Sequence, residues 1–420
     1  MNAFDKIIGY ESIKKELIIL ADMMRNSEKY ARLGVSMPRG VLLYGEPGVG
    51  KTLMANCLIE ASGRKVFTLR KDKPDGDFVL SIHDTFCRAK AEQPCIVFLD
   101  DMDKFTECQR FRSNAEEFVA VQSCIDDVAG DDVFVIATVN NDDYLPDSLL
   151  REGRLGRKLK IEAPKGQDAV NIVRHFLSQK KCVAEVDAAA VAKMLNGDSC
   201  ARLDAVINEA GIYAAMSGKE LIDLEDMIRG ILRVKFDAPE SVDDTPKDVL
   251  LAHAYHEAGH AVVAEILEPG SVCLVSILAH DGDIGGVIDY YRSERYWTDI
   301  DYMQNRVVAL LAGKAATELV YGKVDVGAGS DLRRAHDIVD RIVDHYCASA
   351  FDCMERDDMT GVALRDRKEV RMAIEMEKAY AQAKRILAEN RTFLDALAHA
   401  LVEKKTLIAS DISYIKDEIK

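Results

Sequence analysis

Two histidines and a glutamate stand at a spacing that suits zinc chemistry. His256, Glu257 and His260 lie in a stretch of helical periodicity from about Val249 to Leu267, which ends before Pro269. Residues four apart share one face of a helix, so both imidazoles can bind one tetrahedral Zn²⁺. Glu257 can then act as general base on a water activated by the metal. The pattern predicts a zinc peptidase site, although the same five-residue pattern also arises by chance in helices.

A zinc site of this kind needs a third protein ligand. A continuation with a glycine and a third histidine is absent, because those positions hold Val263 and Ile266. Spacing alone leaves Glu318 and Asp331 as candidates and does not choose between them. The chemistry predicted is attack of water on a peptide carbonyl, with Glu257 taking the proton and passing it to the leaving amine.

A phosphate-binding motif lies near the N-terminus. Eight consecutive residues match it: Gly45, Glu46, Pro47, Gly48, Val49, Gly50, Lys51 and Thr52. The glycines let backbone N–H groups surround phosphates, Lys51 reaches the outer phosphates, and Thr52 offers a hydroxyl to Mg²⁺. An apolar run precedes the motif and a helical pattern follows it, which is the context that the motif requires.

Polar residues after later apolar runs complete this nucleotide site. Asp100 and Asp101 follow one such run, and we expect the first carboxylate to hold Mg²⁺ and the second to polarise the attacking water. Asn140 follows the next run and is a candidate to orient the water or the terminal phosphate. Arg154 and Arg157 are candidate arginine fingers toward the ATP of a neighbouring subunit, which implies a ring; the alternative is surface arginines in weak ion pairs.

The elements that must position these groups form three predicted domains. Helical stretches alternate with short apolar runs up to about Ala163, which predicts an α/β domain with a five-stranded parallel sheet. The predicted strands are Gly40–Tyr44, Lys65–Leu69, Cys95–Leu99, Val133–Thr138 and Lys158–Ile161. We expect this domain at residues 1–165, a helical lid at 166–237 and a mainly helical peptidase domain at 238–420, with a strand-like section from Ser271 to Tyr291 and an amphipathic segment from Lys368 to Lys404.

The composition excludes several classes of protein. With 420 residues, 48% of them hydrophobic, the chain has enough apolar material for several cores. A formal net charge of −16 argues against nucleic acid or anionic membranes as partners. Ten cysteines without a C-x-x-C pair suit a reducing compartment, and no apolar run reaches about 18 residues. We therefore expect a cytoplasmic protein without a membrane segment, membrane-anchored only if the chain is a truncated form.

The motifs and their surroundings resemble the FtsH family of ATP-dependent zinc peptidases. The resemblance runs from Phe4 to Thr52, through the polar residues above and Ile207–Ala210, and across the C-terminal domain. It implies an ATP-dependent zinc metalloendopeptidase that takes Zn²⁺, Mg²⁺ and ATP, degrades protein substrates and assembles as a homo-oligomer, a hexamer. It also adds Ile8, Gly9 and Leu53 to the nucleotide-binding residues.

The same resemblance assigns roles in the peptidase domain. The family's third zinc ligand is an aspartate that opens a helix, here Asp331 in the segment Gly327–Asp331. Glu318 then becomes a partner of a ligand histidine, or a surface residue of its helix. Three further residues resemble the edge strand that binds extended substrate: Gly286, Val287 and Ile288.

The chain departs from the family pattern at several positions. Asp101 replaces a glutamate, and the segment Arg70–Asp77 is polar where the family carries a pore aromatic, with Phe78 the nearest aromatic. Cys200 and Arg202 replace a glycine and an aspartate near the expected adenine pocket. Slow ATP turnover and restricted threading are therefore expected, and the alternative function is a nucleotide-regulated remodelling or binding protein with a weak or uncoupled peptidase.

Overall fold

The computed structural model describes residues 2–71, 77–105, 115–238, 245–278, 286–291, 299–323, 327–348 and 362–419. It divides into two compact units: Met1–Lys181 with Gly197–Ala205, and Cys182–Asn196 with Val206–Lys420. The helices expected to form a lid are shared between them. Helix α6 (Gly166–Ser178) belongs to the first unit, α7 (Ala188–Met194) and α9 (Leu224–Phe236) belong to the second, and α8 (Cys200–Met216) has residues in both. The three-domain division stays a prediction.

The first unit contains the expected five-stranded parallel sheet, in the order β2-β3-β4-β1-β5. Its strands are β1 (Gly40–Tyr44), β2 (Lys65–Leu69), β3 (Cys95–Leu99), β4 (Val133–Val139) and β5 (Arg157–Lys160). The α/β prediction is confirmed, with differences of one residue at β4 and β5. The carboxyl ends of β1, β3 and β4 meet at one edge of the sheet, so the segments that follow them lie together there.

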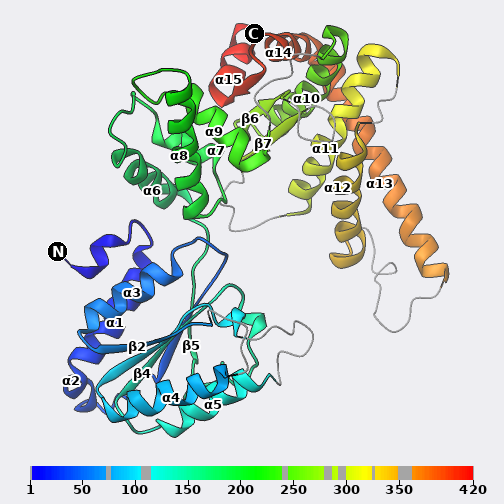
Figure 1. Ribbon diagram of the computed structural model, residues 1–420. Coiled ribbons are helices and arrows are strands. Elements are labelled where there is room, and N and C mark those ends of the chain that lie inside the picture. Colours follow the sequence, from blue (N-terminus) through cyan, green and yellow to red (C-terminus); the bar gives the residue numbers. More distant parts are fainter. Residues whose placement is uncertain are drawn as a thin grey trace. The chain divides into compact units, whose positions relative to one another are not determined.

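Helices cover both faces of this sheet (Figure 1). They are α1 (Glu11–Arg25) and α3 (Lys51–Ser62) on one face, and α4 (Phe78–Ala91) and α5 (Glu116–Asp127) on the other. Strand β1 feeds both cores, because Val41 and Leu43 face one set of helices and Leu42 faces the other. Short helical segments complete the unit: η1 (Ala3–Lys6), α2 (Ser27–Ala31), η2 (Met102–Lys104) and η4 (Asp142–Tyr144).

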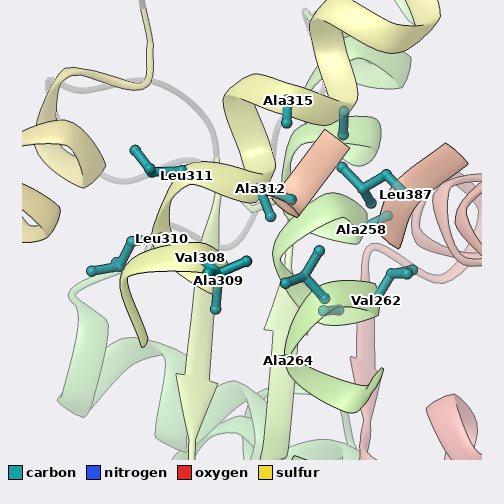
Figure 2. Close-up of a cluster of buried hydrophobic side chains, with 14 of the residues drawn as sticks. Ala258, Val262, Ala264, Val308, Ala309, Leu310, Leu311, Ala312, Ala315 and Leu387 are labelled. Atoms are coloured by element: carbon teal, nitrogen blue, oxygen red, sulfur yellow. The ribbon is translucent and has the colours of Figure 1, made fainter. Parts of the chain in front are cut away.

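The second unit is mainly helical. Its remaining helical elements are α10 (Lys247–Leu267), α11 (Ile300–Tyr321), α12 (Gly329–Asp340), the π-helical turn η5 (Arg341–His345), α13 (Val362–Glu389), α14 (Arg391–Lys404) and α15 (Ala409–Glu418). The predicted amphipathic segment therefore consists of two helices, separated at Asn390. In Figure 2, Ala258 and Val262 of α10 lie with Ala312 of α11 and Leu387 of α13 in one buried cluster.

A three-stranded antiparallel sheet in the order β7-β6-β8 packs beside these helices. The strands β6 (Val272–Ser276) and β7 (Val287–Tyr290) lie in the predicted strand-like section. The third strand, β8 (Thr406–Ile408), was not predicted, because three residues carry too little pattern. Strand β7 pairs only with β6 among the described strands and is an edge of the sheet. Among the described helices, none is both long and apolar enough to cross a membrane.

Candidate active site and nucleotide loop

Helix α10 brings His256, Glu257 and His260 together in the core of the second unit, and all three are buried. The Nε2 atoms of the two histidines are 3.1 Å apart. Asp331, in the first turn of α12, places its Oδ2 atom 3.2 Å from Nε2 of His256 and 3.3 Å from Nε2 of His260. These residues form a metal-ligating triad within the described part of the chain.

The triad fits a zinc ion. Ligand atoms about 2.0–2.1 Å from a tetrahedral zinc lie about 3.3–3.4 Å from one another, close to the separations found here. Nδ1 of His260 is 2.7 Å from the carbonyl oxygen of Ala309, which can only accept, so Nδ1 carries the proton. The lone pair of the ring is therefore on Nε2, the atom that faces Asp331.

A close approach of α11 shapes the triad. A Cβ atom on Gly313 would lie 2.4 Å from Nε2 of His260 and 2.5 Å from Nε2 of His256. On α10, a Cβ on Gly259, the residue before His260, would lie 2.7 Å from the carbonyl oxygen of Ala312. Glycine at these two positions lets α10 and α11 pack closely enough to hold both rings. Neither role was predicted from the sequence.

Burial and charge set the protonation states of the site. Burial would raise the pKa of Asp331, but its hydrogen bonds with His256 and His260, with the charge of Arg334, hold that pKa well below the usual range. Burial raises the pKa of Glu257, and the two imidazoles offset part of this rise. A carboxylate with a raised pKa is a stronger proton acceptor, as a general base requires.

The residue that precedes β7 lies against Glu257. A Cβ atom on Gly286 would lie 2.3 Å from Oε1 of Glu257, so the backbone there is in contact with the carboxylate. The structure therefore brings the predicted substrate strand, with Val287 and Ile288 directly after Gly286, to Glu257, the predicted general base.

Glu318 lies elsewhere than expected for a partner of a ligand histidine. Its carboxylate accepts a hydrogen bond from Nζ of Lys384 at 2.6 Å and another from the hydroxyl of Tyr380. Both partners belong to α13, so Glu318 links α11 to α13. Glu318 was expected to be the hydrogen-bond partner of a ligand histidine. For His260, that partner is instead the carbonyl oxygen of Ala309.

The phosphate loop of the first unit surrounds Lys51. Its Nζ donates to the carbonyl oxygens of Gly45 at 2.7 Å and Glu46 at 2.9 Å, and to Oδ1 of Asn140 at 2.9 Å. Gly45 has φ of 148°, and a Cβ there would lie 1.9 Å from the carbonyl oxygen of Ile161. Only glycine suits this position. The loop conformation therefore rests on its own glycines and on the strand ends.

Carboxylates face Thr52 and Lys51 from the ends of β3 and η2. Oδ1 of Asp100 accepts from the Thr52 hydroxyl at 3.1 Å, which places together the two groups expected at Mg²⁺. Asp101 instead lies 2.7 Å from Nζ of Lys104. Burial lowers the pKa of Lys51, and nearby carboxylates oppose this, that of Asp103 most strongly.

Asp103 is a site residue that was not predicted. Its Oδ2 accepts from Nδ2 of Asn140 at 2.7 Å, and its buried Oδ1 has no hydrogen-bond partner among the described residues. It therefore joins the network that Asn140 forms with Lys51. The signal available in the sequence was its position two residues after Asp101, in a turn that follows a buried strand.

The start of α8 contacts the same loop and also the N-terminal segment. The amide of Ala201, at the start of α8, donates to the carbonyl of Gly48 at 3.0 Å. Sγ of Cys200 lies 3.6 Å from the hydroxyl of Tyr10, the residue that follows Ile8 and Gly9. The roles of Ile8, Gly9 and Leu53 in binding nucleotide stay predictions.

Arg154 and Arg157 pair with carboxylates of their own chain. Nη2 of Arg154 is 2.7 Å from Oδ2 of Asp126, and Arg157 contacts Glu16. Their action on a neighbouring subunit stays a prediction. Of the expected pore segment, residues 72–76 lie outside the described residues.

The fold and the two sites define a class of protein: a phosphate-loop ATPase joined in one chain to a metallopeptidase of the His-Glu-x-x-His type. Residues 41–163 match the ATPase family associated with various cellular activities (AAA), and residues 247–415 match peptidase family M41. The chain is 32% identical to ATP-dependent zinc metalloprotease FtsH 1 of Thermomicrobium roseum, covering 99% of this chain and 68% of that protein. It is 28% identical to FtsH 2 of Thermoanaerobacter sp., covering 99% of this chain and 83% of the relative.

The chain belongs to the FtsH family of ATP-dependent zinc metalloproteases. The predicted family and fold class are confirmed, as are the predicted zinc, magnesium and ATP.

Proposed function

We propose that this chain is an ATP-dependent zinc metalloendopeptidase that degrades protein substrates. The observation that carries the proposal is the triad of His256, His260 and Asp331, with ligand atoms 3.1–3.3 Å apart beside a buried Glu257. Zinc in this site supplies Lewis acidity and makes water nucleophilic at neutral pH. Membership of the FtsH family supports the same activity.

The chain's own residues then carry the proton and place the substrate. Glu257 takes a proton from the attacking water and passes it to the leaving amine. An extended peptide adds to the free edge of β7, which lies against Glu257 at Gly286, so its backbone is aligned with the base. The Ala309 carbonyl keeps His260 in the tautomer that binds metal.

ATP hydrolysis drives the delivery of substrate in this proposal. Lys51 contacts the phosphates, and Thr52 with Asp100 holds Mg²⁺. The AAA family match supports an oligomer, and we propose a homohexamer in which Arg154 and Arg157 act on the neighbouring subunit's ATP. To do so, each arginine must leave its present carboxylate partner. The cytoplasmic location expected from the sequence stays a prediction.

A second candidate function is nucleotide-regulated remodelling with a weak or uncoupled peptidase. It is favoured by Asp101, which is one methylene shorter than the family's glutamate and pairs with Lys104. A direct test separates the two functions: cleavage of unfolded fluorescent casein by the zinc-loaded protein, with and without ATP. Isosteric Glu257→Gln and the loop variant Lys51→Ala serve as controls.

We expect cleavage that requires ATP and is abolished in both variants, while Glu257→Gln keeps its zinc and its ATPase activity. ATP turnover with no cleavage by the wild-type protein would favour remodelling. Cleavage of a short flexible peptide at equal rates with and without ATP would show an uncoupled peptidase.

A further inference from the structure

The hydroxyl of Tyr290 is buried and has no hydrogen-bond partner among the described residues. Tyr290 is the last residue of β7, and Gly286, the residue that precedes this strand, lies against Glu257. Buried hydroxyls are nearly always hydrogen-bonded, because water is lost without replacement when they are not. An unpaired donor on a strand that leads away from Glu257 suggests that its acceptor arrives with the substrate.

The alternation of β7 turns Tyr290 toward the site. Residues 286, 288 and 290 share one face of an extended strand, and on that face Gly286 points at Oε1 of Glu257. The irregularity in the β6–β7 pairing lies in β6, where Val272 pairs with Tyr290 and Leu274 pairs with Asp289. The alternation along β7 is therefore continuous from Gly286 to Tyr290.

Helix α11 holds the ring from the other side. The guanidinium of Arg306 lies 4.8 Å from the centroid of the Tyr290 ring, and within the described residues this arginine pairs with no carboxylate. Arg306 is three residues before Ala309, whose carbonyl binds His260, and seven before Gly313, which contacts both imidazoles. These positions share one face of α11, so the ring is held by the face that shapes the metal site.

The surroundings keep the phenol protonated. Burial raises the pKa of Tyr290; Arg306 opposes this, and the carboxylates of Glu257 and Asp331 raise it further. The hydroxyl therefore remains a hydrogen-bond donor at neutral pH. Tyr290, Arg306 and Ala309 also line a cavity of about 20 Å³, together with Tyr291 and the C-terminal end of α10 at Ala264 and Leu267.

We propose that Tyr290 is a catalytic residue that donates a hydrogen bond to the carbonyl oxygen of the scissile peptide bond as negative charge develops there. In the reaction, a water oxygen bonds to the carbonyl carbon, the carbon–nitrogen bond breaks, and the proton taken by Glu257 goes to the amine. Tyr290 keeps its own proton throughout. The inference rests on the proposed peptidase function and adds an electrostatic contribution to it.

Tyr290→Phe tests this role, with Tyr291→Phe as the matched control, because it removes the same hydroxyl from the next residue, whose ring centroid lies 5.6 Å from Nζ of Lys193. On a short fluorogenic peptide, we expect kcat of Tyr290→Phe to fall about 10²-fold, as for loss of one oxyanion donor, with KM and zinc content unchanged. The control should keep kcat within about twofold. Unchanged kcat in Tyr290→Phe, or loss of zinc in parallel with activity, would overturn the proposal.

A binding measurement separates this inference from the peptidase proposal. Calorimetry gives the affinity of a phosphinic peptide, whose tetrahedral anion mimics the transition state, and of the uncleaved substrate peptide in a Glu257→Gln background. We expect Tyr290→Phe to weaken only the phosphinic peptide, about 10²-fold. Equal effects on both ligands, or none, would refute the role of Tyr290. A wild-type protein that cleaves nothing would instead refute the proposed peptidase function.

Discussion

Replacing Gly313 with alanine should disable the metal site without changing any charge or hydrogen-bonding group. The added methyl carbon would lie 2.4 Å from Nε2 of His260 and 2.5 Å from Nε2 of His256, whereas real Cβ atoms essentially never approach other atoms closer than 3.0 Å. The rings or α11 must therefore move by roughly 0.5 Å, beyond the ~0.2 Å tolerance of metal–ligand distances. We expect zinc affinity to fall at least about 10- to 100-fold.

The assay is zinc affinity by competition with a chromogenic chelator, with circular dichroism to verify folding. Gly329→Ala is the matched control, because a Cβ on Gly329 has nothing within 4 Å, although it lies two residues from the ligand Asp331. This variant should bind zinc normally. Wild-type affinity in Gly313→Ala would refute the steric reasoning, and equal losses in both variants would show that helix composition, not the close approach, determines the site.

Three further predictions concern groups outside the triad. Asp103→Asn should lower ATP turnover about tenfold in a phosphate-release assay while nucleotide affinity is unchanged. The reason is that the Asp103 carboxylate is the charge that most strongly opposes the effect of burial on the pKa of Lys51. Unchanged turnover would exclude a role of Asp103 in hydrolysis. Lys235 and Asp289 form an ion pair whose side chains are only 14% and 15% exposed. The losses of unfolding free energy in Lys235→Met and Asp289→Asn should therefore be non-additive in the double variant, by about 0.5–3 kcal/mol. Additive losses would contradict a coupling between the two side chains. The pKa of Glu318 is lowered by its hydrogen bonds with Lys384 and Tyr380, so the stabilisation that its carboxylate provides is complete above about pH 4.5 and is lost as the pH falls through the folded pKa. The drop in Tm caused by Glu318→Gln should therefore be constant from pH 8 to 5 and shrink below pH 4.5. A drop in Tm that persisted below pH 4.5 would contradict the ionic origin.

Local sequence patterns were sufficient to predict the features that are formed by residues close together in the sequence. The five strands were predicted because each is a short apolar run bounded by polar residues, and His256, Glu257 and His260 because one helical turn places them together. The third ligand is a different case. Spacing could not choose between Glu318 and Asp331, because the choice depends on how α11 and α12 pack against α10, and only family resemblance favoured Asp331.

Glycine inside a helix was the signal that the sequence offered for that packing. A mid-helix glycine costs about 0.5–1 kcal/mol relative to alanine, so Gly259 and Gly313 within long helical patterns each indicate a close approach of another backbone or side chain. The structure places Ala312 and Ala316 opposite Gly259, and both imidazoles opposite Gly313. Reading the two glycines together would have predicted a contact between α10 and α11.

Tyr290 offered no comparable signal, because an aromatic residue in a strand is what strand propensity already predicts. The proposed role of Tyr290 depends on three facts that only the fold supplies. Gly286 touches Glu257, the strand alternates without a break up to Tyr290, and Arg306 contacts the ring from the same face of α11 as Gly313. The peptidase site is thus formed where an edge strand and the α10–α11 pair converge. Substitutions that shift this strand should therefore affect kcat before they affect zinc binding, whereas those between the two helices should affect zinc first.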